Sequence, residues 1–395
     1  MSKNIKVQAE KKQGVNRAGG SLLRKLELAR AKLEKAAAVE RVDYYIGIDV
    51  GDLKSFYCVL DEFGEILAEG SFPTTASGFE RHFKALGRSR IALEVGTHSP
   101  WVSEQLEKQG HEVYVANTRK MGGGKKSRRK KNDRLDAEML ARHVRSDPKQ
   151  LYPIRHRREK TRRGLILLRA RDAFVNARTK LVNAARGLVK SSGYRLPKCG
   201  SEVFHKLCLE GLPKELQVAL KPMLDQIGQL TEKVKGYDKE VNRMSLKAYP
   251  ETKVLKQVKG VGPLVALAYV LTMEDPGFFR KSREVGPYLG LVPRQYDSGN
   301  SSPQLRITKT GDRMMRKLLV QSAQYILGPF GSDSDLRRHG KKIAERGGKN
   351  GKKRAIVAVA RKLAVLLHRL WQTGEVYNPL YNSQFNEANE LRETA

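Results

Sequence analysis

"YYIGIDVG", residues 44–51, is the stretch that decides the fold this sequence predicts. It is a short apolar run rich in β-forming residues, and it ends on Asp49 and a glycine turn. Two more strand-like runs follow it directly, "SFYCVLDEFG" at 55–64 and "EILAEGSFPTT" at 65–75. Three consecutive strands separated by short turns predict a β-meander.

Helical and strand-like segments alternate beyond this meander. Apolar residues recur at helical spacing in 77–87 and 99–110, whereas "RIALEVG" (90–96) and "HEVYVAN" (111–117) are typical of buried strands. A further helix begins near Asp133. Three strands, helix, strand, helix, strand and helix is the element order of a ribonuclease-H-like domain. We therefore predict an α/β domain of the RuvC/ribonuclease-H-like class over residues 43–153.

Long helices with a coiled-coil period are predicted over residues 154–250. Apolar residues recur at steps of seven in two neighbouring series, Leu167, Phe174, Leu181, Leu188 and Leu168, Val175, Val182, Val189. A later series alternates steps of three and four through Leu220, Met223, Ile227, Leu230, Val234, Tyr237, Val241, Met244 and Ala248. The segment 191–200 separates the two helices, so they either pack together as a hairpin or pair with other subunits.

A mostly helical C-terminal domain is predicted over residues 251–395. Its first motif, "QVKGVGPLVALAYVL" (257–271), has the glycine turn of a helix-hairpin-helix, in which amides near Gly260 and Gly262 bind a backbone phosphate. The alternative is an ordinary tight turn. A hairpin-like stretch (288–312) and a helix (313–327) follow, and we expect the apolar helix 355–371 in the core.

Charge indicates the class of partner. The chain of 395 residues carries 76 Lys and Arg against 42 Asp and Glu, a formal charge of +34, which favours a polyanion and above all a nucleic acid. Residues 1–42 form a basic extension, either a solvated tail or a nucleic-acid-binding arm. No stretch has the apolar length of a membrane span or of a secretory signal, and the three cysteines lack metal-ligand spacing. We expect a cytoplasmic protein with reduced, structural thiols.

Four acids form the candidate catalytic site. Asp49 and Glu94 end the first and fourth strands, and Asp133 and Asp136 share one face of the helix that follows. Such an oxygen cluster suits Mg²⁺ during phosphodiester displacement. The alternative is that Asp133 caps its helix and Asp136 complements the helix dipole. The basic residues directly before them would bind phosphate: Lys125, Lys126, Arg128, Arg129, Lys130 and Lys131.

Several motifs, taken in order, resemble a known family. They are "IGIDVG", the Glu of "ALEVG", "KNDRLDA", "VKGVGP", "GLVPRQYDSG" and "TKTGDRMMRKLLVQSA". Together they resemble the DEDD transposases of insertion sequences, a group of bridge-RNA-guided recombinases. The resemblance covers 44–327 and continues through 355–371. The sequence departs from the family pattern in its basic N-terminal extension and in Asn132, where Thr or Ser is expected.

The resemblance implies a mechanism and its partners. Asp49, Glu94, Asp133 and Asp136 would bind the metal, and Ser298 of "YDSG" would attack a DNA phosphate to give a phosphoserine-linked strand. Partners would be donor and target DNA, a noncoding bridge RNA and further copies of the chain, as dimers assembling to a tetramer, in a bacterial or archaeal nucleoid. Taken alone, a Ser-Gly after Asp in a polar stretch is more typical of a turn than of a catalytic residue.

Cations around Ser298 would contact phosphate, although each is also compatible with plain solvated surface. They are Arg294, Arg306, Lys309, Arg313, Arg316 and Lys317. Two other function classes stay open: a junction-resolving endonuclease that uses water, and a nonenzymatic RNA- or DNA-binding protein. The first leaves the C-terminal motifs unexplained, and the second leaves the four acids unexplained.

Overall fold

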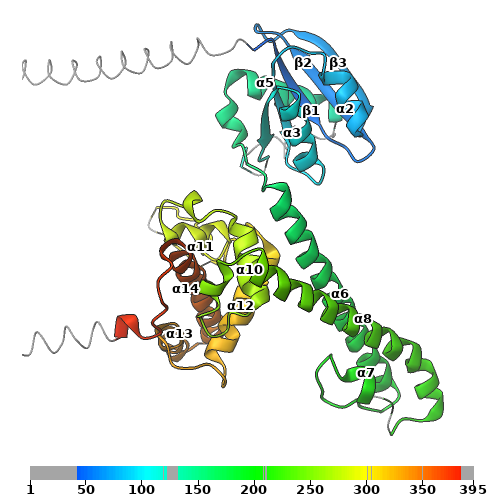
Figure 1. The fold of residues 1–395 in the computed structure, drawn as a ribbon, viewed down its shortest axis with the longest axis vertical. Coiled ribbons are helices and arrows are strands. Elements are labelled where there is room, and N and C mark those ends of the chain that lie inside the picture. The colour runs from blue at the N-terminus through cyan, green and yellow to red at the C-terminus, as the bar shows by residue number, and fades with distance from the viewer. Residues whose placement is uncertain are drawn as a thin grey trace, which may run out of the picture. The chain divides into compact units, whose positions relative to one another are not determined.

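The computed structural model describes residues 42–118, 120–121, 132–207, 209, 211–299, 301–303, 305–348 and 350–383 (Figure 1). The chain forms two compact units that divide between His156 and Arg157. The predicted N-terminal extension lies outside the described residues except for Val42. Apart from residues 154–156, the predicted helical region and the predicted C-terminal domain fall within one unit, the second.

The first unit contains one five-stranded sheet. Its strands are β1 (Tyr44–Asp49), β2 (Lys54–Leu60), β3 (Ile66–Pro73), β4 (Ser89–Glu94) and β5 (Glu112–Ala116), in the spatial order β3-β2-β1-β4-β5. β1, β2 and β3 are antiparallel neighbours, and β4 runs parallel to both β1 and β5. The predicted meander and the mixed α/β order are therefore confirmed.

Helices cover both faces of this sheet (Figure 1). α2 (Ala76–Phe83) and α3 (Ser99–Lys108) pack on the face that carries Ile46, Ile48 and Leu93. Alternate strand residues point to the opposite face, where α5 (Asp133–Ser146) packs. The short 3₁₀ helix η1 (Pro148–Leu151) then adds Leu151 to the core under α5.

Gly47 sets how closely α5 approaches β1. A Cβ atom built at Gly47 would lie 1.9 Å from the carbonyl oxygen of Ala137 and 2.4 Å from the amide nitrogen of Ala141. Backbone therefore contacts backbone at this crossing, and no side chain fits between them. Cys58 lies beside Gly47 on the paired strand and packs against the same two alanines. Burial raises the pKa of the Cys58 thiol to about 11, as expected for a structural thiol.

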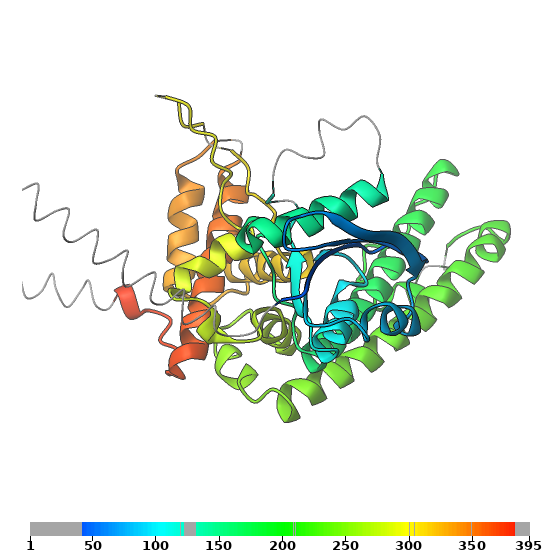
Figure 2. The same cartoon turned by 90° about the horizontal axis from the view of Figure 1, so that it is seen from above.

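Two long helices begin the second unit. α6 (Glu159–Ser191) and α8 (Lys214–Lys247) run side by side in both views, and the one-turn helix α7 (Phe204–Leu207) packs against α8 (Figures 1 and 2). Arg171 contacts Asp238 at 2.6 Å, and Arg178 contacts Thr231 at 3.2 Å. The later residue of α6, Arg178, contacts the earlier residue of α8, Thr231, so the two helices are antiparallel. The open choice is thereby resolved: the helices form a hairpin within one chain.

Only some residues of the predicted apolar series are buried in the structure. In α8 the buried members are Leu220, Ile227, Leu230, Val234 and Val241, whereas Ala248 is exposed just after the helix ends. In α6 the buried series is the one through Leu168, Val182 and Val189, whereas Leu188 of the other series is 57% exposed. A buried polar pair, Arg178 with Thr231, lies in the middle of the hairpin, and neither residue belongs to a predicted apolar series.

A helical core completes the second unit around α10 (Pro263–Met273), in which every residue from Ala266 onward is buried. The elements around it are α9 (Thr252–Leu255), η2 (Pro276–Phe278), η3 (Ser282–Glu284), α11 (Val285–Tyr288), α12 (Arg313–Leu327), α13 (Asp335–Glu345) and α14 (Gly351–Thr373). α14 buries one face in this core, as predicted. Among the helices described, none combines the length and apolarity needed to cross a bilayer.

Candidate functional site

Asp49 and Glu94 end neighbouring parallel strands. The register pairs Gly47 with Ala92 and Ile48 with Leu93, so Asp49 and Glu94 come next at the carboxyl edge. Both acids fall on the strand face of Gly47 and Ala92, which is the face that α5 covers. Each is half-buried. The first two predicted acids therefore lie side by side, on the side of the sheet that faces α5.

The orientation of α5 brings its first turn toward this edge. Near its C-terminal end Arg145 donates to the carbonyl of Glu62, in the β2–β3 turn at the opposite end of the sheet. Near its N-terminal end Arg134 lies 3.4 Å from Glu69, which belongs to the middle of β3. The first turn of α5 therefore projects toward the carboxyl end of β1. Asp136 directly precedes Ala137, the residue that contacts Gly47.

Asn132, rather than Asp133, caps α5. Its side-chain oxygen accepts a hydrogen bond from the Arg134 amide at 3.1 Å, whereas Asp133 is the first helical residue. The alternative in which Asp133 serves as the cap is therefore wrong. Asn, Ser and Thr are all good caps, so the departure at position 132 keeps the local structure. Asp133 and Asp136 stand three residues apart at the positive end of the helix dipole, with both side chains half-buried.

The carboxylates are not gathered into a closed cage. Glu94 accepts a hydrogen bond from the Thr118 hydroxyl at 2.6 Å. Over the part of the chain that the structure describes, no three His, Cys, Asp or Glu side chains come close enough to hold a metal ion. Backbone geometry therefore directs the four acids toward one end of the sheet, and metal binding by them stays a prediction. The donor set, carboxylate oxygens alone, fits a hard divalent cation.

One interaction at this edge, that of His98 with Asp52 and Trp101, was not predicted from the sequence. Asp52, three residues after Asp49, accepts from Nε2 of His98, four residues after Glu94, at 3.1 Å. The indole N–H of Trp101 donates to Nδ1 of the same histidine, also at 3.1 Å. The loops that follow the two strand-end acids are thus tied together. A His three residues before the Trp of "HSPW" and an Asp after "DVG" were the only signals available.

Ser298 lies at the tip of a hairpin in the second unit. Its amide donates to the carbonyl of Ser301 at 3.1 Å, and the Ser301 amide donates back at 3.0 Å. Gly299 has a φ of +53°, which such a tight turn favours. Ser298 is exposed, and next to it the Ser302 hydroxyl donates to Asp297 at 2.7 Å. The predicted nucleophile is therefore exposed on the surface of the second unit.

The cations predicted around Ser298 divide into two groups. Arg316 donates to the carbonyls of Leu289 and Thr310, and Lys317 pairs with Asp172 of α6 at 2.7 Å. These two side chains stabilise the fold, and burial lowers the pKa of Arg316. The remaining four are exposed and make no ion pair with any described residue: Arg294, Arg306, Lys309 and Arg313.

The glycine turn differs from a full helix-hairpin-helix. α9 is only four residues long, so one long helix is present instead of two. Gly260 has a φ of +95°, and a Cβ there would lie 3.1 Å from the ring of Tyr325 in α12. Gly262 caps α10 ahead of Pro263. Phosphate binding at this turn stays a prediction, as does binding by the basic residues 125–131, which lie outside the described residues.

Comparison with known proteins decides the family. A transposase family model, that of the DEDD transposases of IS110 elements, matches residues 46–193, and the model "Transposase IS116/IS110/IS902 family" matches residues 252–335. The chain is 30% identical over 254 residues to the transposase for insertion sequence element IS1111A of Coxiella burnetii, covering 62% of this chain and 68% of that protein. The chain belongs to the IS116/IS110/IS902 family of transposases.

Other relatives agree with this assignment. The transposase is 28% identical over 238 residues to the transposase for IS1328 of Yersinia enterocolitica, covering 59% of this chain and 70% of that one. It is 25% identical over 304 residues to a probable family 20 transposase of Pseudomonas aeruginosa, covering 75% and 88%. The first match covers the first unit from β1 onward and continues through α6 of the second unit, whereas the second match lies wholly in the second unit. The four acids fall within the first match and Ser298 within the second.

Proposed function

We propose that this transposase excises and inserts its own mobile element by cutting and rejoining DNA through a phosphoserine intermediate, guided by a noncoding RNA. The observation that carries the proposal is the placement of Asp49 and Glu94 side by side at the carboxyl edge, facing the helix whose first turn holds Asp133 and Asp136. Carboxylates repel a negatively charged phosphodiester, but a divalent cation bound between them would offset this repulsion. A cluster of acids in so basic a chain is therefore consistent with metal-dependent chemistry on DNA.

The four acids would hold the metal and the serine would carry the strand. Asp49, Glu94, Asp133 and Asp136 supply only oxygen ligands, and the bound ion would stabilise charge on the phosphate oxygens. Because the ligands lie on two strands and one helix, the site depends on the contact between α5 and β1 at Gly47. The Asp52–His98 contact would hold the two loops beyond the strand-end acids in place.

Ser298 would act as the nucleophile. Its hydroxyl oxygen would attack phosphorus, one bond between phosphorus and a sugar oxygen would break, and that oxygen would leave with a proton. A free sugar hydroxyl of another strand would then attack the phosphoserine and release Ser298. One bond forms for each bond that breaks, so strands exchange without net hydrolysis. Exposure of Ser298 on the hairpin tip supports this role.

The test is to trap the covalent intermediate. Purified transposase, Mg²⁺, RNA transcribed from the flanking noncoding DNA, and labelled donor and target duplexes are combined and resolved on a denaturing gel. We expect protein-linked DNA with the wild type and none with Ser298→Ala or Asp49→Ala, while both variants still bind nucleic acid. Ser301→Ala, in the same hairpin, is the matched control and should retain the band. Free cleaved ends that do not depend on Ser298 would show a water-using nuclease instead.

A further inference from the structure

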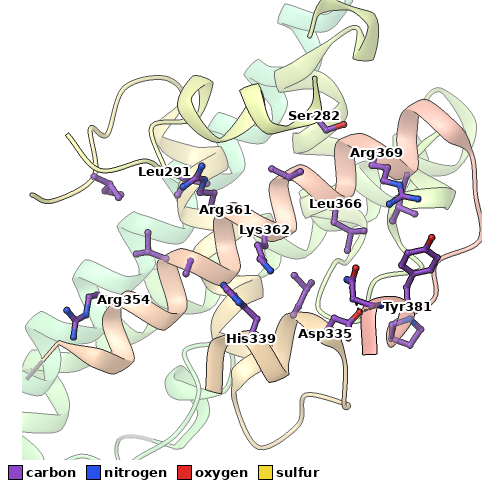
Figure 3. Close-up of a pocket in the computed structure, with 18 of the residues that line it drawn as sticks. Ser282, Leu291, Asp335, His339, Arg354, Arg361, Lys362, Leu366, Arg369 and Tyr381 are labelled. Carbon is purple, nitrogen blue, oxygen red and sulfur yellow. Dashed lines mark hydrogen bonds between the residues drawn. The ribbon is translucent and has the colours of Figure 1, made fainter. Parts of the chain in front are cut away.

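A groove of about 1430 Å³ runs along α14 in the second unit. α14 supplies one long side, and the start of α13, the arms of the Ser298 hairpin and the segment 375–382 supply the rest (Figure 3). Figure 3 shows Arg354, Arg361, Lys362 and Arg369 following one another along α14, with Asp335, His339 and Tyr381 on the facing elements. The groove thus joins segments distant in sequence and lies wholly within one compact unit.

The groove carries a strong excess of positive charge. Among the residues that the structure describes, two acids line it, and both are engaged: Glu375 pairs with Arg369 at 3.0 Å, and Asp335 accepts from Asn382 and Ser383. Six other lining cations make no ion pair with any residue in the described ranges: Arg306, Lys309, Lys353, Arg354, Arg361 and Lys362. So many uncompensated cations in one groove favour a polyanionic occupant.

The floor of the groove is apolar. Val357, Ala358, Val365 and Leu366 of α14 lie half-buried between the cations, and Leu291 and Ile307 of the hairpin arms line the same space. At one end Tyr381 is 52% exposed, with the guanidinium of Arg369 5.6 Å from its ring centroid. A duplex keeps the faces of its bases stacked inside and presents mainly its sugar-phosphate backbone to such a surface. A single strand also presents unpaired bases, which the apolar floor and the tyrosine ring can contact.

The groove leads to the hairpin that carries Ser298. Pro293, Leu305 and Ile307 line it, and the same two arms continue to the paired residues Ser298 and Ser301. Arg294 and Arg306 are joined through their backbones between these points. We propose that the groove holds the single DNA strand adjoining the phosphate that Ser298 attacks, with its phosphates on the α14 cations and its bases on the apolar floor. This inference rests on the proposed function, because it takes Ser298 as the point of attack.

Charge reversal along α14 tests the inference. Binding of a labelled single strand of about 16 nucleotides to the full chain is measured by fluorescence anisotropy, with every variant in a Ser298→Ala background so that no chemistry follows. The variant Lys353→Glu/Lys362→Glu reverses two exposed groove lysines. The matched control Lys239→Glu/Lys247→Glu reverses two exposed lysines on α8 and changes the net charge equally. We expect about a tenfold or greater loss of affinity for the first variant and less than about twofold for the second.

Three results would overturn the inference. Equal losses in the two variants would show only general attraction to a basic protein. An equal loss of affinity for duplex and for single-stranded DNA in the groove variant would rule out a strand-specific site. Competition by polyglutamate as strong as by unlabelled DNA at equal charge would point to an acidic protein segment as the occupant.

The strand-binding assay tests the groove, and the covalent assay tests the serine mechanism, so one of the two proposals can fail without the other. Loss of strand binding in the groove variant, together with no covalent band in the wild type, would leave the groove assignment standing and the serine mechanism wrong. Normal strand binding by the groove variant, together with a Ser298-dependent band in the wild type, would leave the mechanism standing and the groove assignment wrong.

Discussion

Gly47 is the residue on which the acidic site depends most directly. Any side chain there meets the backbone of α5 at Ala137 and Ala141, and neither backbone can yield without separating helix from strand. Asp49 lies two residues along β1 and Asp136 directly precedes Ala137, so the same displacement would separate the strand-end acids from the helix acids. Packing and the proposed metal binding are therefore coupled at one position.

We predict that Gly47→Ala destabilises the first unit by about 2 to 3 kcal/mol, the cost of overpacking a tight contact. For a unit of this size that corresponds to a fall in Tm of about 10 °C or more. Gly96→Ala is the control, since no atom lies within 4 Å of a Cβ built at Gly96. Thermal unfolding followed by circular dichroism gives both values. An unchanged Tm in Gly47→Ala would show that α5 does not pack this closely on β1.

At the scale of single elements, periodicity predicted the strands and helices well. The short apolar runs of β1 and β4 predicted both strands, and the acids at the ends of these runs, Asp49 and Glu94, lie side by side in the sheet. The seam of α6 and α8 was less predictable. Two adjacent heptad series in α6 were equally apolar, and only the contact with α8 decides that Leu168, and not Leu188, is buried.

The groove cations on α14 escaped prediction for a similar reason, whereas Arg306 and Lys309 were predicted as phosphate contacts. The pattern of α14 marks it as a core helix, and its core face is confirmed. Arg354 and Arg361 are seven residues apart, as are Lys362 and Arg369, a spacing that places cations repeatedly on the exposed face. That spacing does not reveal a groove, because the facing wall comes from the Ser298 hairpin and from residues 375–382. Only tertiary structure brings these segments together.

α14 also carries a buried histidine that links its stability to pH. His368 is fully buried, its Nδ1 lies 3.0 Å from the Ser282 hydroxyl, and its Nε2 lies 2.9 Å from the carbonyl of Pro276, to which it donates. Burial lowers the pKa of His368, against the opposing effects of the Pro276 carbonyl and Glu284. The folded state therefore binds this proton less well than the unfolded chain, whose histidine pKa is about 6.5.

We predict that the second unit is most stable above that value and loses free energy of unfolding as the pH falls through it. His368→Gln should flatten this dependence between about pH 7 and pH 5, because the uncharged amide does not take up a proton. Some dependence should remain, since burial also lowers the pKa of His339. Urea unfolding at several pH values provides the measurement. Identical slopes in wild type and variant would mean that His368 is not the titrating group.

At the scale of the whole molecule, the two units have separate cores. The apolar clusters around the sheet draw only on residues before Arg157, and those of the hairpin and of α10 draw only on residues after it. The acids thus belong to one folding unit and Ser298 to the other. This separation allows the two chemistries to be tested apart.

We predict that residues 42–156 alone unfold cooperatively, since the five strands and their covering helices lie within them. A single thermal transition by circular dichroism with dispersed amide resonances would establish that the fragment folds. Given Mg²⁺ and branched DNA, the folded fragment should then give no cleaved product, because Ser298 is absent and the proposed reaction uses it in place of water. The Asp49→Ala fragment is the control for contaminating nuclease. Cleavage by the fragment that disappears in this control would mean that the four acids activate water without the second unit, and Ser298 would then be only a turn residue.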